Sequence, residues 1–337
     1  MSGQHDSAGF SRRRFHHALG AGALAALGTP MVDAQTQAQA WPSKPIRFIV
    51  PYTPGGFTDI TARLIAQKLG ERLGQVVTID NKPGGNSIIG VDALAKSAPD
   101  GLTFGVVIAA YAANTTLYPK LPYDPKKDLV AVSLIGQSPL VAAVNNNAPY
   151  KTVGELVAFA RAHPGKVSFG SSGSGSAAHL TTEYLKAVTR TYMVHIPYRG
   201  AAPALNDLMG GQIELFLDAA SGMIQPGKGG KVRLIGVASD KRLAALPEVP
   251  TFIEQGIAGF TGSTWAGILA PAGTPREVIK RVADEVAAIV RLDDVKAKLD
   301  AMGTIAVGSS PEAFAAFIAA ETSKWGKVIQ DAKVTLD

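Results

Sequence analysis

Three glycine-containing loops each follow an apolar, strand-like run and open a helix-like run. They are YTPGGFTD at 52–59, NKPGGNS at 81–87 and GSSGSGS at 170–176. Glycine lets the main chain approach a ligand closely, and the start of a helix presents N–H groups that no helical carbonyl satisfies. In an open α/β sheet, ligands bind beyond the carboxyl ends of the strands, where such loops lie. The loops therefore predict an α/β protein that binds a ligand at these strand ends.

The rest of the chain continues the alternation of strands and helices. Apolar runs at 46–50, 76–80 and 102–108 predict the first strands, and a helix at 59–73 places Ile60, Leu64, Ile65, Leu69 and Leu73 on one face. Apolar runs at 130–136 and 139–145 predict a long extended segment that crosses between two parts of the fold. Further strands are expected at 166–171, 193–198, 213–217, 232–239 and 265–271. Helices are expected at 87–96, 275–291 and 311–329, and three more are expected to begin at Thr152, Ser176 and Ala201. This order predicts mainly parallel, doubly wound sheets.

The first 40 residues have the features of an export signal. SRRRF at 11–15 precedes a short apolar run, and small residues end at Ala34 and Ala40. The arginine pair is typical of twin-arginine signals, and a Sec signal that carries arginines explains the segment equally well. We therefore predict a signal peptide over 1–34, with cleavage at 34 or 40, and a periplasmic location.

Composition excludes several classes of function. The chain has no cysteine, so disulfides, thiolate metal sites and cysteine nucleophiles are absent. Its 46% apolar and 18% charged residues are typical of a globular protein, and the net charge of +6 is spread along the chain rather than clustered as in nucleic-acid-binding proteins. The histidines lack metal-ligand spacing. We expect no metal, no cofactor and no nucleic acid partner.

The chemistry of the three loops favours a carboxylate ligand. Neither the phosphate-binding pattern G-x-x-x-x-G-K-[ST] nor the dinucleotide pattern G-x-G-x-x-G occurs, and Lys82 is the only cation, at a loop edge. Neutral N–H and hydroxyl donors at a helix start suit a carboxylate. A capped turn explains any one of these loops as well as binding does, but three in one chain favour binding.

The serines at 171, 172, 174 and 176 also allow a hydrolase or amidase. No G-x-S-x-G elbow with a central serine is present, and no lysine partner is identified for amidase chemistry. His179 is expected to cap or line the loop. A base within hydrogen-bond reach of one of these serines would favour an enzyme, whereas its absence, with a wide cleft, would favour a receptor. We predict a receptor without catalytic residues.

The mature chain resembles the substrate-binding proteins of tripartite tricarboxylate transporters, the Bug family of periplasmic receptors. The resemblance follows the segments WPSKPIRFIVPYTPGG, NKPGG, LPYDPKKDL, PGKVSFGSSGSGSAAHL, VHIPYRGAAPALNDLMGGQIELFLD, ALPEVPTFIEQG, GILAPAGTP and KWGKVIQDAKVTLD in order. It implies a type II periplasmic-binding-protein fold, with one lobe at 41–138 and 263–337, a second at 139–262, and a ligand cleft between them. It further implies a monomer that captures a di- or tricarboxylate, an amino acid or an aromatic acid for membrane permease subunits or a sensor kinase.

The resemblance also assigns residues to the ligand site. It implies Tyr52, Gly55, Gly56, Phe57, Asp59, Gly85, Ser87 and Tyr111 in the first lobe, Ser171, Ser172, Ser174, Ser176, His179, Arg199 and Asp218 in the second, and Trp265 beside the hinge. Alternatives remain for four of them: Asp59 as a helix cap, Arg199 as a solvated charge, Trp265 as interlobe packing, and Asp218 as a partner for a water or a ligand amine or hydroxyl.

Two segments depart from the family pattern. The loop IAAYAAN at 108–114 offers few hydroxyl donors, which predicts a more apolar pocket on that side. IQPGKGGK at 224–231 predicts a short, frayed helix in the second lobe.

Overall fold

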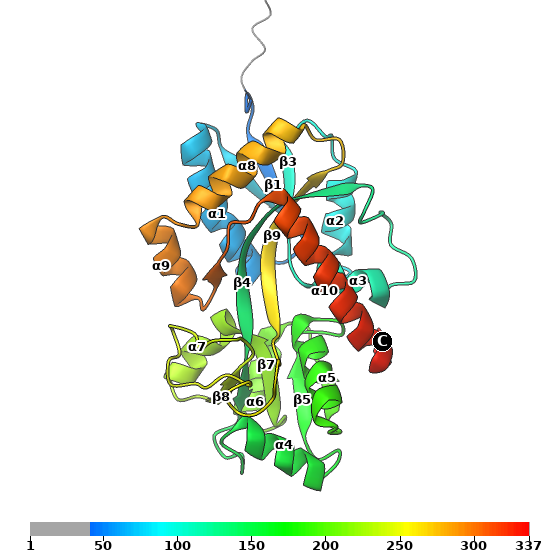
Figure 1. The fold of residues 1–337 in the computed structure, drawn as a ribbon, viewed down its shortest axis with the longest axis vertical. Coiled ribbons are helices and arrows are strands. Elements are labelled where there is room, and N and C mark those ends of the chain that lie inside the picture. The colour runs from blue at the N-terminus through cyan, green and yellow to red at the C-terminus, as the bar shows by residue number, and fades with distance from the viewer. Residues whose placement is uncertain (1–40, 337) are drawn as a thin grey trace, which may run out of the picture. The chain divides into compact units, whose positions relative to one another are not determined.

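The computed structural model describes residues 41–336, so the predicted signal peptide at 1–34 lies outside the described residues. Helices and strands alternate along the described part of the chain (Figure 1). The strands are β1 (Ile46–Val50), β2 (Val77–Asn81), β3 (Thr103–Val107), β4 (Leu129–Val144), β5 (Ser168–Ser171), β6 (Val194–Pro197), β7 (Leu215–Ala219), β8 (Arg233–Val237), β9 (Ser263–Pro271) and β10 (Ile305–Ala306). The helices are α1 (Phe57–Leu73), α2 (Ile88–Ala95), α3 (Ala110–Leu117), α4 (Val153–Ala162), α5 (Ala177–Thr189), α6 (Ala201–Met209), α7 (Ala220–Lys228), α8 (Arg276–Ile289), α9 (Asp293–Ala301) and α10 (Pro311–Asp331).

The long strand β4 belongs to two sets of strands. Its first part, Leu129–Pro139, pairs antiparallel with β9, which in turn pairs antiparallel with β3 of the parallel set β2-β1-β3. From Leu140 onward β4 pairs antiparallel with β7 and β8, and β7 continues into the parallel set β7-β5-β6. The sheet is therefore mixed: the sets β2-β1-β3 and β7-β5-β6 are parallel, and the pairings of β4 and β9 are antiparallel.

These registers turn the carboxyl ends of the two parallel sets toward each other. Along β9, Gly105 of β3 pairs with Leu269 and Val107 with Gly267, so β3 runs toward the level of Ser263, the partner of Pro139. On the other side, β7 begins opposite Val144 and ends opposite Leu140. The end of β3, Val107, pairs with Gly267 opposite Leu134, and β7 ends opposite Leu140. The loops after β1, β3, β5 and β7 therefore open toward each other around the segment Leu134–Leu140 of β4.

Helices cover both faces of each set of strands. Around β1–β3 and β9, one core contains residues of α1, α8 and α9, and another contains residues of α2, α3 and α10. Around β5 and β7, α4 and α5 pack on one core and α6 and α7 on another. The predicted α/β fold with doubly wound, parallel strand sets is confirmed, and the sheet as a whole is mixed. The lobe limits 41–138, 139–262 and 263–337 stay a prediction, and the change of partner at Pro139–Leu140 fits them.

The structure corrects some of the predicted elements. The two apolar runs at 130–136 and 139–145 form one strand, and α3, α9 and β10 were not predicted. The predicted fraying at 224–231 is wrong as far as Lys228, because α7 continues through Pro226. Met223 and Ile224 are buried in the core, and Gly227 lies against Leu234 with no room for a Cβ atom. This packing holds the helix despite its proline.

Candidate functional site

The loop between β1 and α1 is fixed by the carboxylate of Asp59. Its Oδ2 accepts the N–H of Gly55 and Nε of Arg63, both at 2.9 Å, and its Oδ1 accepts Nδ2 of Asn81 at 2.9 Å. The hydrogen bond from Arg63 is the main reason that the pKa of Asp59 falls to about 2, although burial opposes it. Asp59 therefore stays ionised, and its three hydrogen bonds hold the β1–α1 loop in place.

The first turn of α1 leaves main-chain donors unused. Gly56 is the N-cap residue, and within residues 41–336 no hydrogen bond is made by the N–H groups of Phe57 and Thr58. Gly55 and Gly56 are exposed beside them, and Tyr52 is half-buried at the end of β1. Burial raises the pKa of Tyr52, so its phenol remains a neutral hydroxyl at physiological pH.

The loop before α2 is held by an asparagine pair that sequence reasoning missed. Nδ2 of Asn86 donates to Oδ1 of Asn114 at 2.9 Å, and Nδ2 of Asn114 donates to the Asn86 carbonyl at 2.7 Å. Asn86 and Ser87 both have positive φ, and Ser87, at the N-cap of α2, is buried. Gly85 lies beside them with a positive φ of its own. Asparagine tolerates this conformation better than most residues, which is the signal that could have singled out Asn86.

The loop between β5 and α5 combines a tight internal network with free donors. Ser176 accepts the N–H of His179 at 3.2 Å as the N-cap of α5, and Nδ1 of His179 accepts the N–H of Gly175 at 3.1 Å. In contrast, within the described residues no hydrogen bond is made by the hydroxyls of Ser172 and Ser174. The same holds for the N–H groups of Ala177 and Ala178 in the first turn of α5. These groups are available to an anion.

Ser171 and two histidines lie behind this loop. Ser171 Oγ is 2.7 Å from Nε2 of His195, and the Ser171 side chain also bonds the main chain of Gly173. The rings of His179 and His195 stack with centroids 3.7 Å apart. Burial, and then the neighbouring His195 and Lys186, lower the pKa of His179 to about 3, so this ring is neutral at physiological pH.

A base is thus within hydrogen-bond reach of a serine, which sequence reasoning had taken as a sign of a hydrolase. Ser171 is 0% exposed, however, and its hydroxyl is engaged with Gly173 on both its donor and acceptor sides. A nucleophile must be reachable by its substrate. The geometry therefore supports a structural contact rather than an acylation site.

Asp218 lies at the carboxyl end of β7, next to the start of α7. Burial raises the pKa of its carboxyl group to about 6, although the main-chain N–H of Ala219 opposes the shift.

Arg199 is exposed, and the neighbouring Tyr198 donates its hydroxyl to Asp207 Oδ2 at 2.7 Å.

The glycine at 175 lies where the loops of the two strand sets meet. A Cβ atom there would be 2.5 Å from Cδ1 of Leu117 in α3 and 3.4 Å from Nδ2 of Asn86. Gly175 also has φ +77°, a conformation that favours glycine. The β5–α5 loop therefore lies directly against the loops of the first set, as the sequence predicted for a shared site.

Two of the predicted site residues face elsewhere. Tyr111 is buried, and its hydroxyl donates to the Pro125 carbonyl at 3.0 Å, on the side of a separate cavity. Trp265 is 0% exposed, lies edge-on to Phe314 and Phe317, and donates Nε1 to Glu321 Oε2 at 3.1 Å. Its contacts are those of the packing alternative considered for it.

Other kinds of site find little support in the described residues. Between residues 41 and 336, His, Asp and Glu side chains do not gather in any group of three that could hold a metal ion. No helix in the same range is long and apolar enough to cross a membrane.

Two strand sets with facing carboxyl ends, joined by the crossing strands β4 and β9, define a solute receptor of the periplasmic-binding-protein class. Within this class the chain belongs to the tripartite tricarboxylate transporter family receptors, whose family model matches residues 61–334. It is 34% identical over 307 residues to protein BugT of Bordetella pertussis, covering 90% of this chain and 94% of that protein.

Two solved structures are similar over nearly their whole length. An R. palustris protein solved with adipate is 34% identical, with a TM-score of 0.81, covering 88% of this chain and 100% of that one. MatC from Rhodopseudomonas palustris, solved with malate, is 29% identical, with a TM-score of 0.76, covering 86% and 99%. The family consists of solute-binding receptors, so the receptor interpretation is confirmed and the hydrolase alternative is wrong.

Proposed function

We propose that this receptor captures a small dicarboxylate between the β1–α1 loop and the β5–α5 loop. The observation that carries the proposal is the set of unused donors at the start of α5: the N–H groups of Ala177 and Ala178 and the hydroxyls of Ser172 and Ser174. Helix starts bind anions through such groups and through the partial positive charge of the helix dipole.

A second donor set favours two carboxylates over one. The N–H groups of Phe57 and Thr58 open α1, which follows a strand of the opposite set. The charge of Asp59 is already balanced by Arg63, so it does not repel a ligand as a bare carboxylate would. Asp218 is the other acidic side chain among the predicted site residues, and we propose that it accepts a ligand hydroxyl or holds a water. The ligands of the two R. palustris structures, adipate and malate, are dicarboxylates.

Thermal melting against a panel of acids tests this function. The panel contains adipate, malate, citrate, glutamate and benzoate, with adipamide as the uncharged control. A ligand at about 100 times its dissociation constant adds about 2.7 kcal/mol to the free energy of unfolding. A dicarboxylate should raise the melting midpoint and adipamide should not. If adipamide raises the midpoint as much as adipate, the site does not recognise carboxylate groups and the proposal is contradicted.

We further propose that the receptor works as a monomer in the periplasm and passes its ligand to membrane permease subunits or a sensor kinase. The family to which the chain belongs supports a transporter partner. Fractionation of cells that express the full chain tests the location, and light scattering of the mature protein tests the monomer. A cytoplasmic protein with an unprocessed N-terminus, or a stable dimer, would contradict the corresponding part of this proposal.

A further inference from the structure

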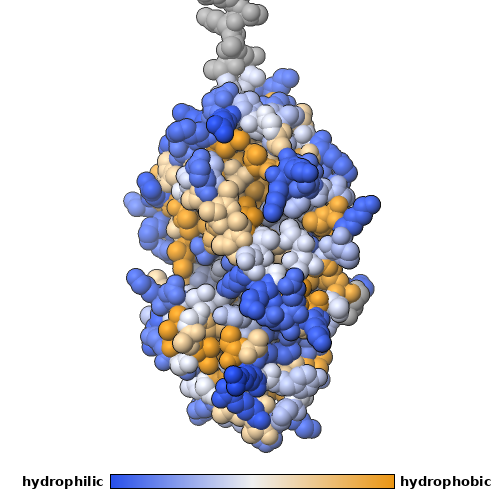
Figure 2. Space-filling model, turned by 45° about the vertical axis from the view of Figure 1, so that its right-hand side comes forward, coloured by the Kyte–Doolittle hydropathy of each residue, from blue (hydrophilic) through white to orange (hydrophobic). Residues whose placement is uncertain are grey.

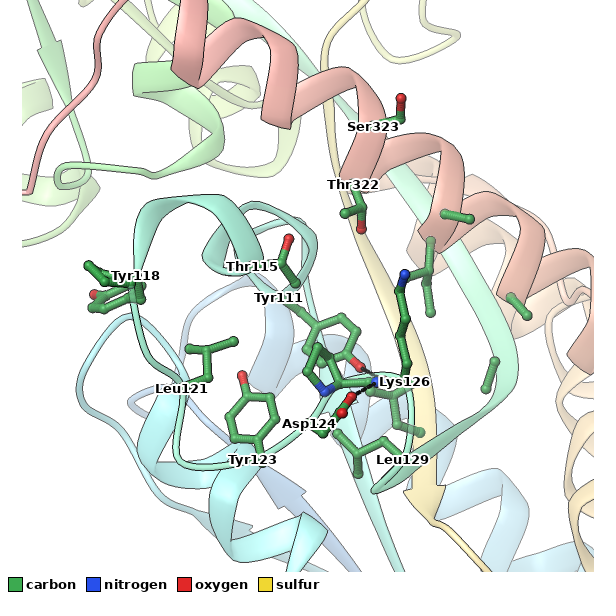
Figure 3. A pocket seen from close by; sticks show the side chains of 17 residues that line it. Tyr111, Thr115, Tyr118, Leu121, Tyr123, Asp124, Lys126, Leu129, Thr322 and Ser323 are labelled. Atoms are coloured by element: carbon green, nitrogen blue, oxygen red, sulfur yellow. Dashed lines mark hydrogen bonds between the residues drawn. The ribbon is translucent and has the colours of Figure 1, made fainter.

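A second cavity lies between α3, the segment 118–128 and α10, away from the Pro139–Leu140 step. Its volume is about 940 Å³, at the upper end of the range for small-molecule sites (Figure 3). The residues that the dicarboxylate proposal uses, from 52–59 and 171–178, do not line it. The cavity is therefore separate from the proposed dicarboxylate site.

Its walls are mainly aromatic and aliphatic. Tyr111 of α3 and Tyr123 of the segment 118–128 line it with their rings, and Leu121, Leu129 and Ile318 add aliphatic surface. The Tyr111 hydroxyl is already used by the Pro125 carbonyl. An aromatic ring that packs edge-on or offset against aromatic walls gains more binding free energy than its buried area alone provides. The cavity thus suits a planar, apolar group.

One cation at this cavity has no partner, although an acid lies beside it. Asp124 accepts the N–H groups of Lys126 and Lys127 at 2.9 and 3.2 Å, and the Lys127 ammonium is 3.6 Å from its Oδ2. These contacts lower the pKa of Asp124 and balance its charge. Lys126 makes no ion pair within residues 41–336, and its side chain reaches toward α10 (Figure 3). Together with Lys127, which lies outside the lining, Asp124 and Lys126 carry a net charge of +1.

We propose that this cavity is an accessory site for an aromatic monocarboxylate, with the ring between the tyrosines and α10 and the carboxylate on the Lys126 ammonium. The hydroxyl of Thr322 on α10 points into the cavity and adds a donor for the acid group. A charge-assisted hydrogen bond of this kind fixes the orientation of the ligand, while the apolar walls supply most of the affinity.

Binding of 4-fluorobenzoate to the mature chain, followed by ligand-observed ¹⁹F NMR, tests the site. Ala319 lines the cavity from α10, and Ala319→Phe should fill it and abolish saturable binding. Ala320→Phe, on the next and likewise exposed position of α10, is the matched control and should leave binding unchanged. Lys126→Gln should weaken binding about tenfold, whereas Lys120→Gln, at an exposed lysine that does not line the cavity, should not.

Saturating adipate, and the variant Ser174→Ala in the β5–α5 loop, separate this site from the proposed dicarboxylate site. Adipate should not displace 4-fluorobenzoate, and Ser174→Ala should not weaken its binding. Hexanoate should bind more weakly than the aromatic acid. The proposal is overturned if no saturable binding occurs, if Ala319→Phe binds as the wild type does, or if adipate competes. Failure of the dicarboxylate proposal alone would leave these results unchanged.

Discussion

The hydroxyl of Ser171 lies 2.7 Å from Nε2 of His195, yet Ser171 is 0% exposed and belongs to a solute receptor. The Ser171–His195 contact is expected to fix the β5–α5 loop behind the ligand. Ser171→Ala leaves the partly buried Gly173 main chain and His195 ring without this partner, which should lower the free energy of unfolding by about 1 kcal/mol. Urea unfolding measures this, with Ser172→Ala as a control near zero.

The same contact predicts the absence of covalent chemistry. A fluorophosphonate, which labels activated serines, should not label the wild-type chain, and no ester or amide of the panel acids should be hydrolysed. Labelling that Ser171→Ala removes would show that the hydroxyl is an accessible nucleophile, contrary to this account.

Asp59 should be a stability residue of the β1–α1 loop. It is 2% exposed and accepts hydrogen bonds from Gly55, Arg63 and Asn81, so Asp59→Ala leaves three donors without their acceptor. The expected loss is about 2–4 kcal/mol in the free energy of unfolding. Asp80→Ala, which removes only the ion pairs with Arg47 and Lys82 at the surface, should cost less than about 1 kcal/mol. Equal losses would contradict this role.

Asp218 gives stability a specific dependence on pH. The pKa of its carboxyl group is about 6 in the folded chain and 3.8 in the unfolded reference, so between these values the folded state binds more protons. Its contribution to stability is therefore present below about pH 3.8 and is lost as the pH rises through about 6.

Asp218→Asn removes this loss. At pH 8 the variant should be more stable than the wild type by at most about 3 kcal/mol, and at pH 3.5 the two should be similar. Acid charging of His179 lowers stability as the pH falls below 6.5, but both proteins share it, so it cancels in the difference. Urea unfolding from pH 3.5 to 8 makes the comparison. A difference that stays constant with pH would rule out the raised pKa.

Ligand binding should bring the two strand sets closer around β4 and β9. In the register described, β4 crosses the Pro139–Leu140 step and β9 begins at it, with Ser263 opposite Pro139. A ligand held by α1 and α5 favours the state in which it touches both strand sets. Solution scattering should give a smaller radius of gyration with the bound acid. An unchanged radius at full saturation would argue against closure.

Periodicity and turn residues predicted most of the fold, because strand runs such as 103–107 are buried on both faces and carry no charged residue. Predictions that rested on the local sequence pattern alone, without knowledge of the tertiary packing, failed in two helices. Ile60 was placed on the buried face of α1 but is 44% exposed, since Asp59, Thr61 and Ala62 take the buried positions. The helix α3 was missed because its alanines and threonines give little periodic contrast.

The candidate site was predictable in its loops but less so in its individual side chains. Glycine and serine patterns located the β5–α5 loop, and Ser176, where a helix was expected to begin, is its N-cap residue. The directions of Tyr111 and Trp265 depend on which neighbour completes their hydrogen bonds, Pro125 and Glu321, and these partners are distant in sequence. The Asn86–Asn114 pair was missed for the same reason.

The substitution Ala177→Pro isolates the central claim, that the first turn of α5 binds a carboxylate through main-chain N–H groups. Proline is favoured at the first position of a helix, and it removes one unused N–H. Ser176 has φ −67° and ψ 161°, nearly identical to Ser310, which already precedes Pro311 at the start of α10. The variant should therefore fold normally, as should Asp293→Pro at the start of α9, the control.

The decisive measurement is calorimetric titration of Ala177→Pro with the acid that raises the melting midpoint of the wild type most. Losing one charge-assisted hydrogen bond should weaken binding by about tenfold or more, with the melting midpoint of the free protein unchanged and Asp293→Pro binding as the wild type does. An affinity within twofold of the wild type, in a variant that melts normally, would contradict the account.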